Sequence, residues 1–253
     1  MSVDLKAEFK LDCKAVADGG KTTAIIVGGG NASRMGGEDK ILLPLAGVPT
    51  IIRSIKAFED CEGVDNIVLV LRKDIINTVQ NLITDYGLKK VTDLVEGGQT
   101  RAESVKAGLA VCGMATDTLL IHDGARPLIA KDIIESVMDA VELYGAAAPG
   151  VPLKDTVKII DHSGKILTTP DRSTLVAIQT PQGFKMPLYV EALSRFEDAE
   201  ITDDCGLLER AGHSVYTVEG SYENIKITTP EDVEIAEGII RRREKQNENR
   251  PWL

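Results

Sequence analysis

The sequence predicts an α/β protein built on a doubly wound, mostly parallel sheet. Short runs of apolar, often β-branched residues alternate with segments in which apolar residues recur at helical spacing. Most of the residues in these runs are apolar, as expected of parallel strands that helices cover on both faces. With 253 residues and 43% hydrophobic content, the chain can bury one large core.

Five apolar runs are expected to be strands of this sheet. They are "TAIIV" (23–27), "NIVLVL" (66–71), "TLLIH" (118–122), "AAAPGV" (146–151) and "NIKIT" (224–228). Runs of this length and composition are typical of buried parallel strands, so each is expected to pair within one sheet.

Two segments between these runs predict helices that pack on the sheet. In "PTIIRSIKAFED", residues 51, 52, 55 and 58 are apolar at near-helical spacing. "KDIIESVMDAVELYG" repeats this spacing and ends at Gly145, a typical helix terminator. A third helix is expected to begin at Pro230 with Thr229 as its N-cap, and to run into a solvated tail, "RRREKQNENR".

One segment interrupts the alternation of strands and helices. "DTVKIIDHSGKILTT" (155–169) places two strand-like runs around "DHSG", whose Asp, Ser and Gly suit a turn. It predicts a β-hairpin that projects from the sheet as an arm over about residues 152–172. The expected organisation is an extension (1–22), a single domain that includes the arm (23–241) and a solvated C-terminal tail (242–253).

Composition excludes several classes of function. The net charge of -10 argues against a surface that binds nucleic acid. Cys13, Cys61, Cys112 and Cys205 show no metal-ligand spacing, and reduced thiols are expected. The sequence has no apolar stretch near 18 residues and no signal-peptide pattern. We therefore expect a cytoplasmic protein without a membrane segment.

A glycine-rich loop follows the first predicted strand, in "AIIVGGGNASRMGGEDKIL" (24–42). The backbone N–H groups of Gly28, Gly29 and Gly30 can approach a phosphate closely, and Arg34 and Lys40 supply positive charge. The spacing is neither that of a Walker A loop nor that of the dinucleotide fingerprint. Taken alone, the loop is equally consistent with a glycine turn bearing two surface cations.

A carboxylate follows the third predicted strand, in "HDGARP". Asp123 stands at the carboxyl end of that strand, where open α/β sheets bind ligands. A single carboxylate there is a candidate Mg²⁺ ligand, because Mg²⁺ completes its shell with phosphates and water. The alternative is a solvated aspartate in a turn before Pro127. His122 is expected to serve packing, and Arg126 lies one turn away.

Three further segments carry polar residues that are weak indications singly. "EGGQTRAESV" places Arg101 and Ser104 at the start of a helix, where they suit contacts to a base or ribose. "DRSTLVAIQTPQGF" contains Arg172 and Thr180, and Lys226 lies in the last predicted strand. Isolated cations of this kind are often surface charges.

The order of these motifs resembles the 2-C-methyl-D-erythritol 4-phosphate cytidylyltransferase family of the non-mevalonate isoprenoid pathway. The resemblance spans roughly residues 23–241, and the blocks "HDGARP", "QTPQGF" and "NIKITTPED" are its most specific parts. It implies a Rossmann-like nucleotidyltransferase sheet. It also implies that CTP and a sugar-alcohol phosphate are joined with release of pyrophosphate, with Mg²⁺ or another divalent cation as cofactor.

The resemblance also implies roles for individual residues. The catalytic set is Arg34, Lys40, Arg172 and Lys226. The nucleotide is expected to contact Gly28, Gly29, Gly30, Arg34, Lys40, Gly98, Gln99, Ser104 and Asp123, and Asp123 also holds the metal. The sugar phosphate is expected to contact Gly124, Arg126, Thr156, Arg172, Thr180 and Lys226. The family pattern is a homodimer clasped by the arm, so Thr156 and Arg172 are expected to serve a neighbouring subunit's site.

The chain departs from the family pattern at three places. Ala32 stands where a glycine is usual, the interval from Arg34 to Lys40 is one residue shorter, and Gln99 replaces a commonly acidic residue. The alternatives are a related ribitol 5-phosphate cytidylyltransferase, a catalytically silent nucleotide-binding relative and, more distantly, a dinucleotide oxidoreductase. Relatives that act on ribitol 5-phosphate tend to carry serine and valine where this chain has Gly124 and Ala125.

Overall fold

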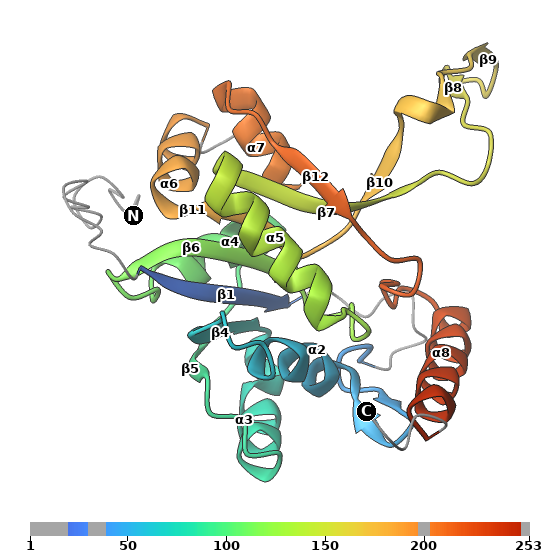
Figure 1. Cartoon of the computed structure of the whole chain (residues 1–253). Coiled ribbons are helices and arrows are strands. Elements are labelled where there is room, and N and C mark those ends of the chain that lie inside the picture. Colours follow the sequence, from blue (N-terminus) through green and yellow to red (C-terminus); the bar gives the residue numbers. More distant parts are fainter. Residues whose placement is uncertain (1–19, 30–38, 197–202, 249–253) are drawn as a thin grey trace.

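The computed structural model describes residues 20–29, 39–196 and 203–248, which build around one central sheet (Figure 1). In the described residues the sheet has eight strands in the order β10-β7-β11-β6-β1-β4-β5, with β12 paired to β7. Pairing is parallel among β6, β1, β4 and β5, and antiparallel where β10 and β11 join. The strands are β1 (Lys21–Gly28), β4 (Asn66–Leu71), β5 (Val91–Glu96), β6 (Thr116–Asp123), β7 (Ala146–Pro152), β10 (Val176–Ile178), β11 (Gln182–Lys185) and β12 (Tyr216–Glu219).

Helices cover both faces of the sheet, which confirms the doubly wound α/β prediction. In β1, Ala24 and Ile26 enter a core with the helices of one face, whereas Ile25 enters a core with those of the other. The first face carries α2 (Thr50–Glu59), α3 (Ile76–Asp85) and α5 (Lys131–Tyr144). The second carries α4 (Arg101–Leu109), α6 (Met186–Arg195) and α7 (Asp204–Ala211). No described helix is long and apolar enough to cross a membrane.

Four of the five predicted strands are present, and the prediction over 224–228 is wrong. Asn224–Thr228 forms no strand, although Ile227 donates a backbone hydrogen bond to the Ala125 carbonyl at 2.8 Å. The segment is held largely by side chains, since the Asn224 amide donates to the Thr180 carbonyl at 3.0 Å. The apolar residues that suggested a strand, Ile225 and Ile227, instead pack into a small core with α8 (Pro230–Glu248).

Both predicted sheet-packing helices are present as α2 and α5. Gly145 ends α5 with φ of 85°, and its N–H donates to the Val141 carbonyl. The helix expected at Pro230 is α8, and the Asp232 carboxylate accepts the Thr228 and Thr229 N–H groups before it. Helix α8 continues through the arginine run to Glu248.

The predicted hairpin is present as β8 (Ile159–Ile160) and β9 (Ile166–Thr168), which pair antiparallel. Asp161 accepts the N–H groups of Ser163 and Lys165 across the turn. The hairpin projects well away from the sheet at the end of a long excursion between β7 and β10 (Figure 1). Its apolar side chains are between 50% and 59% exposed: Ile159, Ile160, Ile166 and Leu167.

Candidate active site

A cavity of about 430 Å³ opens at the carboxyl ends of β1, β4, β5 and β6. This is the edge at which open α/β sheets bind their ligands. Its lining includes five cationic side chains, Lys40, Arg72, Lys73, Arg101 and Lys226, and two carboxylates, Glu96 and Asp123. The cavity is therefore suited to an anion, although the chain as a whole is acidic.

Glycine backbone forms part of the cavity wall. A Cβ atom on Gly28 would lie 2.9 Å from Ile41 Cδ1 and 3.0 Å from Leu71 Cδ2. At Gly98 a Cβ atom would overlap the side chain of Glu103. A side chain would meet the core at Gly28 and the capping Glu103 at Gly98, so glycine at both positions leaves the backbone open to a ligand.

The wall opposite β1 is the N-terminal turn of α4. Thr100 and Glu103 form a capping box, in which Thr100 Oγ1 accepts the Glu103 N–H at 3.1 Å and Glu103 Oε2 accepts the Thr100 N–H at 3.2 Å. Glu103 Oε2 also accepts the Gln99 N–H at 2.5 Å, and Ser104 donates to the Thr100 carbonyl at 2.9 Å. These bonds fix the course of Gly98, Gln99 and Ser104 along the cavity.

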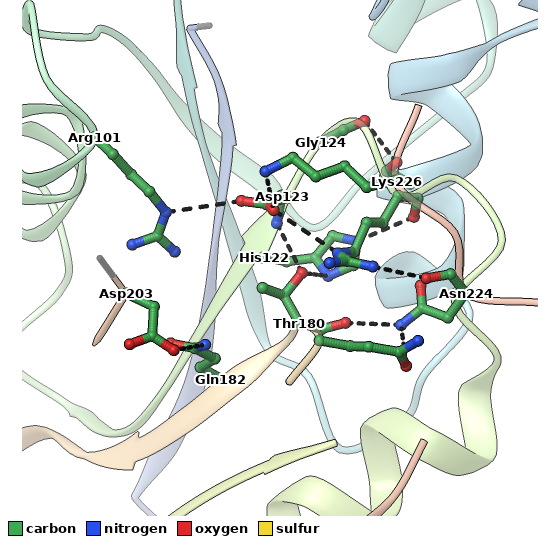
Figure 2. Close-up of polar contacts among 12 residues, drawn as sticks. Arg101, His122, Asp123, Gly124, Thr180, Gln182, Asp203, Asn224 and Lys226 are labelled. Carbon is green, nitrogen blue, oxygen red and sulfur yellow. Dashed lines mark hydrogen bonds and ion pairs between the residues drawn. The ribbon is translucent and has the colours of Figure 1, made fainter. Parts of the chain in front are cut away.

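Asp123 lines the cavity and is largely buried, with its side chain only 13% exposed. Figure 2 shows cations converging on it. Lys226 Nζ is 2.7 Å from Oδ2, Arg126 Nε is 3.7 Å from Oδ2, and Arg101 Nε is 3.8 Å from Oδ1. Burial by itself raises the pKa of Asp123, but the charge and hydrogen bond of Lys226 and the charges of both arginines outweigh burial and lower the pKa to about 2. Asp123 is therefore an anion at neutral pH.

A chain of hydrogen bonds holds the backbone of Asp123 from behind. Its N–H donates to Thr180 Oγ1 at 3.1 Å, and Thr180 Oγ1 lies 3.0 Å from His122 Nδ1. His122 Nε2 lies 3.2 Å from the Arg126 carbonyl, which assigns the ring proton to Nε2. Burial lowers the pKa of His122 to about 4, so the ring is neutral and serves packing, as predicted.

The sequence alone did not reveal the support behind Arg101. Asp204 is buried and forms an ion pair with Arg101, and Tyr189 donates to Asp204 Oδ1 at 2.7 Å. Gln182 Oε1 accepts the Asp204 N–H at 3.0 Å. In the sequence Asp204 is part of "TDD" (202–204), a short polar run that gives no sign of contact with Arg101. The role follows from contacts between residues far apart in the chain.

Arg72 and Lys73 were also missed, although both line the cavity. They follow β4 directly, as Asp123 ends β6, so the rule that locates ligands at strand ends would have found them. Arg72 NH2 is 2.6 Å from Asp39 Oδ2 and 3.0 Å from Asp74 Oδ2.

Many of the predicted site residues meet at this cavity. It is lined by Gly28, Gly29, Lys40, Gly98, Gln99, Ser104, Asp123 and Lys226. Arg126 and Thr180 lie behind Asp123. Gly124 is engaged in packing, since its N–H donates to the Val27 carbonyl and its carbonyl accepts from Ser54. The predicted positions Gly30, Ala32 and Arg34 lie outside the described residues.

Thr156 and Arg172 lie on the arm and do not line the cavity of their own chain. Both are exposed, and Arg172 NH1 donates to the Lys154 carbonyl at 2.5 Å. Within the described residues, no group of three or more His, Cys, Asp or Glu side chains is arranged to hold a metal ion. Asp123 is therefore a candidate metal ligand that would act as a single carboxylate.

Comparison with known proteins adds independent evidence. The family model for 2-C-methyl-D-erythritol 4-phosphate cytidylyltransferase matches residues 22–242. The enzyme of that name from Clostridium novyi is 45% identical over 224 residues, which are 87% of this chain and 96% of that protein. A crystal structure from Anaerococcus prevotii, titled 4-diphosphocytidyl-2C-methyl-D-erythritol synthase, has a TM-score of 0.80 at 30% identity and covers 88% of this chain and 97% of its own. The Thermus thermophilus cytidylyltransferase has a TM-score of 0.70 at 27% identity, over 87% of this chain and 99% of its own.

With these matches, the doubly wound sheet and the cation-lined cavity at its strand ends define a nucleotidyltransferase. The resemblance noted in the sequence blocks is thereby confirmed. The chain belongs to the 2-C-methyl-D-erythritol 4-phosphate cytidylyltransferase family.

Proposed function

We propose that the protein transfers the cytidylyl group of CTP to 2-C-methyl-D-erythritol 4-phosphate. The products are 4-diphosphocytidyl-2-C-methyl-D-erythritol and pyrophosphate. The observation that carries the proposal is the convergence of Lys40, Arg101 and Lys226 with Asp123 on one cavity at the strand ends. Family membership supports the identity of both substrates.

In this proposal CTP lies across the cavity from the glycine wall to α4. The N–H groups of Gly28 and Gly29 and the charge of Lys40 suit the triphosphate. Gly98, Gln99 and Ser104 suit the cytosine and ribose, because the capping box of α4 holds them rigidly at the cavity wall. By the family pattern Arg34 joins Lys40 on the triphosphate.

The reaction requires no covalent bond to the enzyme. An ionised phosphate oxygen of the sugar phosphate attacks the α-phosphorus of CTP, forming one O–P bond as the bond to pyrophosphate breaks. Negative charge increases on the oxygens around the α-phosphorus, and fixed cations lower the barrier by stabilising that charge. Lys226, held at Asp123 and 41% exposed, is placed to orient the attacking phosphate.

Asp123 would hold the divalent cation that we propose as cofactor. The residues fit such an ion, because Asp123 is ionised and Mg²⁺ usually takes one or two protein carboxylates together with substrate phosphates and water. When held by Asp123, the metal would supply positive charge that neutralises part of the charge of the phosphates.

Substrate choice is tested by supplying CTP and Mg²⁺ with each sugar phosphate and measuring pyrophosphate release. We expect turnover with 2-C-methyl-D-erythritol 4-phosphate and none above background with ribitol 5-phosphate. Turnover with ribitol 5-phosphate alone would make the protein the related enzyme of the same fold. CTP binding without turnover on either substrate would make it a catalytically silent relative.

We further propose that the protein is a homodimer in which each arm reaches the partner's site. The exposed apolar side chains of the hairpin support this, because a short two-stranded hairpin is marginally stable until it packs on another surface. The location of Thr156 and Arg172 on the arm, away from their own cavity, also supports it. A cytoplasmic location completes the proposal and agrees with the unpaired thiols of Cys61, Cys112 and Cys205.

Mixing two inactive variants tests the shared site. If Arg172 acts in the partner's cavity and Lys226 in its own, then a heterodimer of Arg172→Ala and Lys226→Ala has one intact site. Equal mixing with subunit exchange should restore about a quarter of parent activity, because half of the dimers are mixed and each has one working site. No recovery, with mixed dimers demonstrated by mass spectrometry, would place Arg172 in its own subunit's chemistry or in none.

A further inference from the structure

An ion pair fixes the residue that directly precedes Lys40. Arg72 follows the last residue of β4, and its NH2 group lies 2.6 Å from Asp39 Oδ2. The side chains are 23% and 14% exposed, so the pair is largely shielded from water. Arg72 also contacts Asp74 at 3.0 Å, but the Asp74 side chain is 66% exposed. Shielded charge pairs are stronger and less affected by salt than exposed ones.

Asp39 is held by its backbone as well as by its carboxylate. Its carbonyl accepts the N–H groups of Leu42 at 2.9 Å and Leu43 at 3.0 Å, and Oδ1 accepts the Ile41 N–H at 3.2 Å. On the other side of Lys40, Ile41 is 2% exposed and its carbonyl accepts the Ile51 N–H at 2.8 Å. Lys40 is therefore flanked by two fixed residues, and its side chain begins from a defined point on the cavity wall.

The charge of Asp39 has the wrong sign for a direct role in binding an anion. A carboxylate beside a triphosphate site repels the ligand unless a cation compensates it. Arg72 provides that compensation at 2.6 Å. The value of Asp39 to such a site therefore lies in its bonds to the chain around Lys40 and not in its charge.

We propose that Asp39 and Arg72 are a positioning pair that places Lys40 against the triphosphate of CTP. This inference rests on the proposed function, in which Lys40 binds the triphosphate. Arg72 joins the end of β4 to the segment that carries Lys40, so the edge of the sheet helps to define the position of this cation.

Replacing Asp39 by alanine tests the proposal, because the two explanations predict opposite changes in CTP affinity. Loss of a negative charge near the cavity should on electrostatic grounds alone tighten CTP binding, whereas loss of the anchor should weaken it. We expect Asp39→Ala to raise the Kd and KM for CTP and to lower kcat/KM by roughly tenfold to a hundredfold, the effect of a small misplacement of a catalytic group. Tighter or unchanged CTP binding by the folded variant would overturn the proposal.

Three further variants complete this test. Asp74→Ala removes the exposed partner of the same arginine and should leave the CTP Kd and kcat/KM at parent values. Asp39→Glu keeps the charge and should recover part of the loss. If the pair acts as a unit, adding Asp39→Ala to Arg72→Ala should cause little further loss, whereas multiplying losses would show that the two residues act independently.

Lys40→Ala separates failure of this inference from failure of the proposed function. A large loss of CTP affinity in Lys40→Ala with none in Asp39→Ala would reject the positioning pair and leave the proposed role of Lys40 intact. An unchanged CTP affinity in Lys40→Ala would reject the role of Lys40 on which the pair depends. Thermal melting of each variant, measured without nucleotide, shows whether any loss reflects unfolding.

Discussion

Replacing Lys226 by alanine should lower kcat/KM by roughly 10²- to 10³-fold, the range found when a single preorganised donor is removed from an active site. Its Nζ atom lies 2.7 Å from Asp123, and its side chain is 41% exposed at the cavity. Because Lys226 is an exposed side chain but pairs with the largely buried Asp123, the free energy of unfolding should fall only modestly, by about 1 to 2 kcal/mol. Steady-state kinetics and urea denaturation measure the two effects separately.

Lys131→Ala is the matched control for this substitution. Lys131 is 45% exposed and pairs with Glu135 at 3.5 Å on α5, outside the cavity lining. It should leave kcat/KM unchanged. If Lys226→Ala loses activity only in proportion to its loss of stability, then Lys226 is structural.

The same variant should change the response of stability to acid. In the parent, the pKa of Asp123 is about 2 against an ordinary value of 3.8, so Asp123 stabilises the fold above about pH 4 and loses that contribution as pH falls towards 2. Without Lys226 the folded-state pKa rises towards its ordinary value. The acid-dependent loss attributable to Asp123 should then become smaller and reach completion at a higher pH, because its onset is set by the unchanged pKa of the unfolded state.

Replacing Asp123 by asparagine should have the second large effect, on metal activation. The metal concentration for half-maximal activity should rise by about 10- to 100-fold, the range found even for residues that only orient metal ligands. Stability should fall by about 1 to 3 kcal/mol, because Lys226, Arg101 and Arg126 lose their shared anion. Activity is measured over a Mg²⁺ titration, at a temperature where urea denaturation shows the variant to be folded.

Asp117→Asn controls for the loss of a partly buried carboxylate. Asp117 is 20% exposed and pairs with Lys185 at 2.6 Å, away from the cavity lining. We expect Asp117→Asn to lower the free energy of unfolding and to leave the Mg²⁺ concentration for half-maximal activity at the parent value. If Asp123→Asn also keeps the parent titration, Asp123 is not a metal ligand and acts only by organising the cations around it.

The sequence predicted the strands whose own residues are mostly apolar, because such strands are recognisable without knowledge of their neighbours. The apolar runs of β1, β4 and β6 read as buried strands because both faces of each are covered. The antiparallel β11 was not foreseen, because the four residues of Gln182–Lys185 give too short a pattern and owe their conformation to pairing with β6. The segment 224–228 was misassigned because its apolar residues, Ile225 and Ile227, indicate burial and not whether a pairing strand is present.

The site residues also divide into those recognisable from the local sequence and those that depend on distant contacts. Asp123 could be found because strand ends are where ligands bind, and Lys40 because it follows a glycine loop. Asp204 and Tyr189 could not, because their role depends on contact with Arg101 from a distant part of the chain. Residues that hold a catalytic group in place carry no local signature, since only the folded chain brings them to it.

The segment that carries Lys226 is held largely by side-chain contacts near its start and not by a strand ladder. Asn224 bonds to Thr180, and Glu223 receives hydrogen bonds from Arg242 and Arg243 of α8. Such ties can be exchanged one at a time without breaking the hydrogen-bond ladder of the main sheet. The position of Lys226 therefore depends on a few individual side-chain contacts, each of which can be altered by a single substitution while the main sheet stays intact.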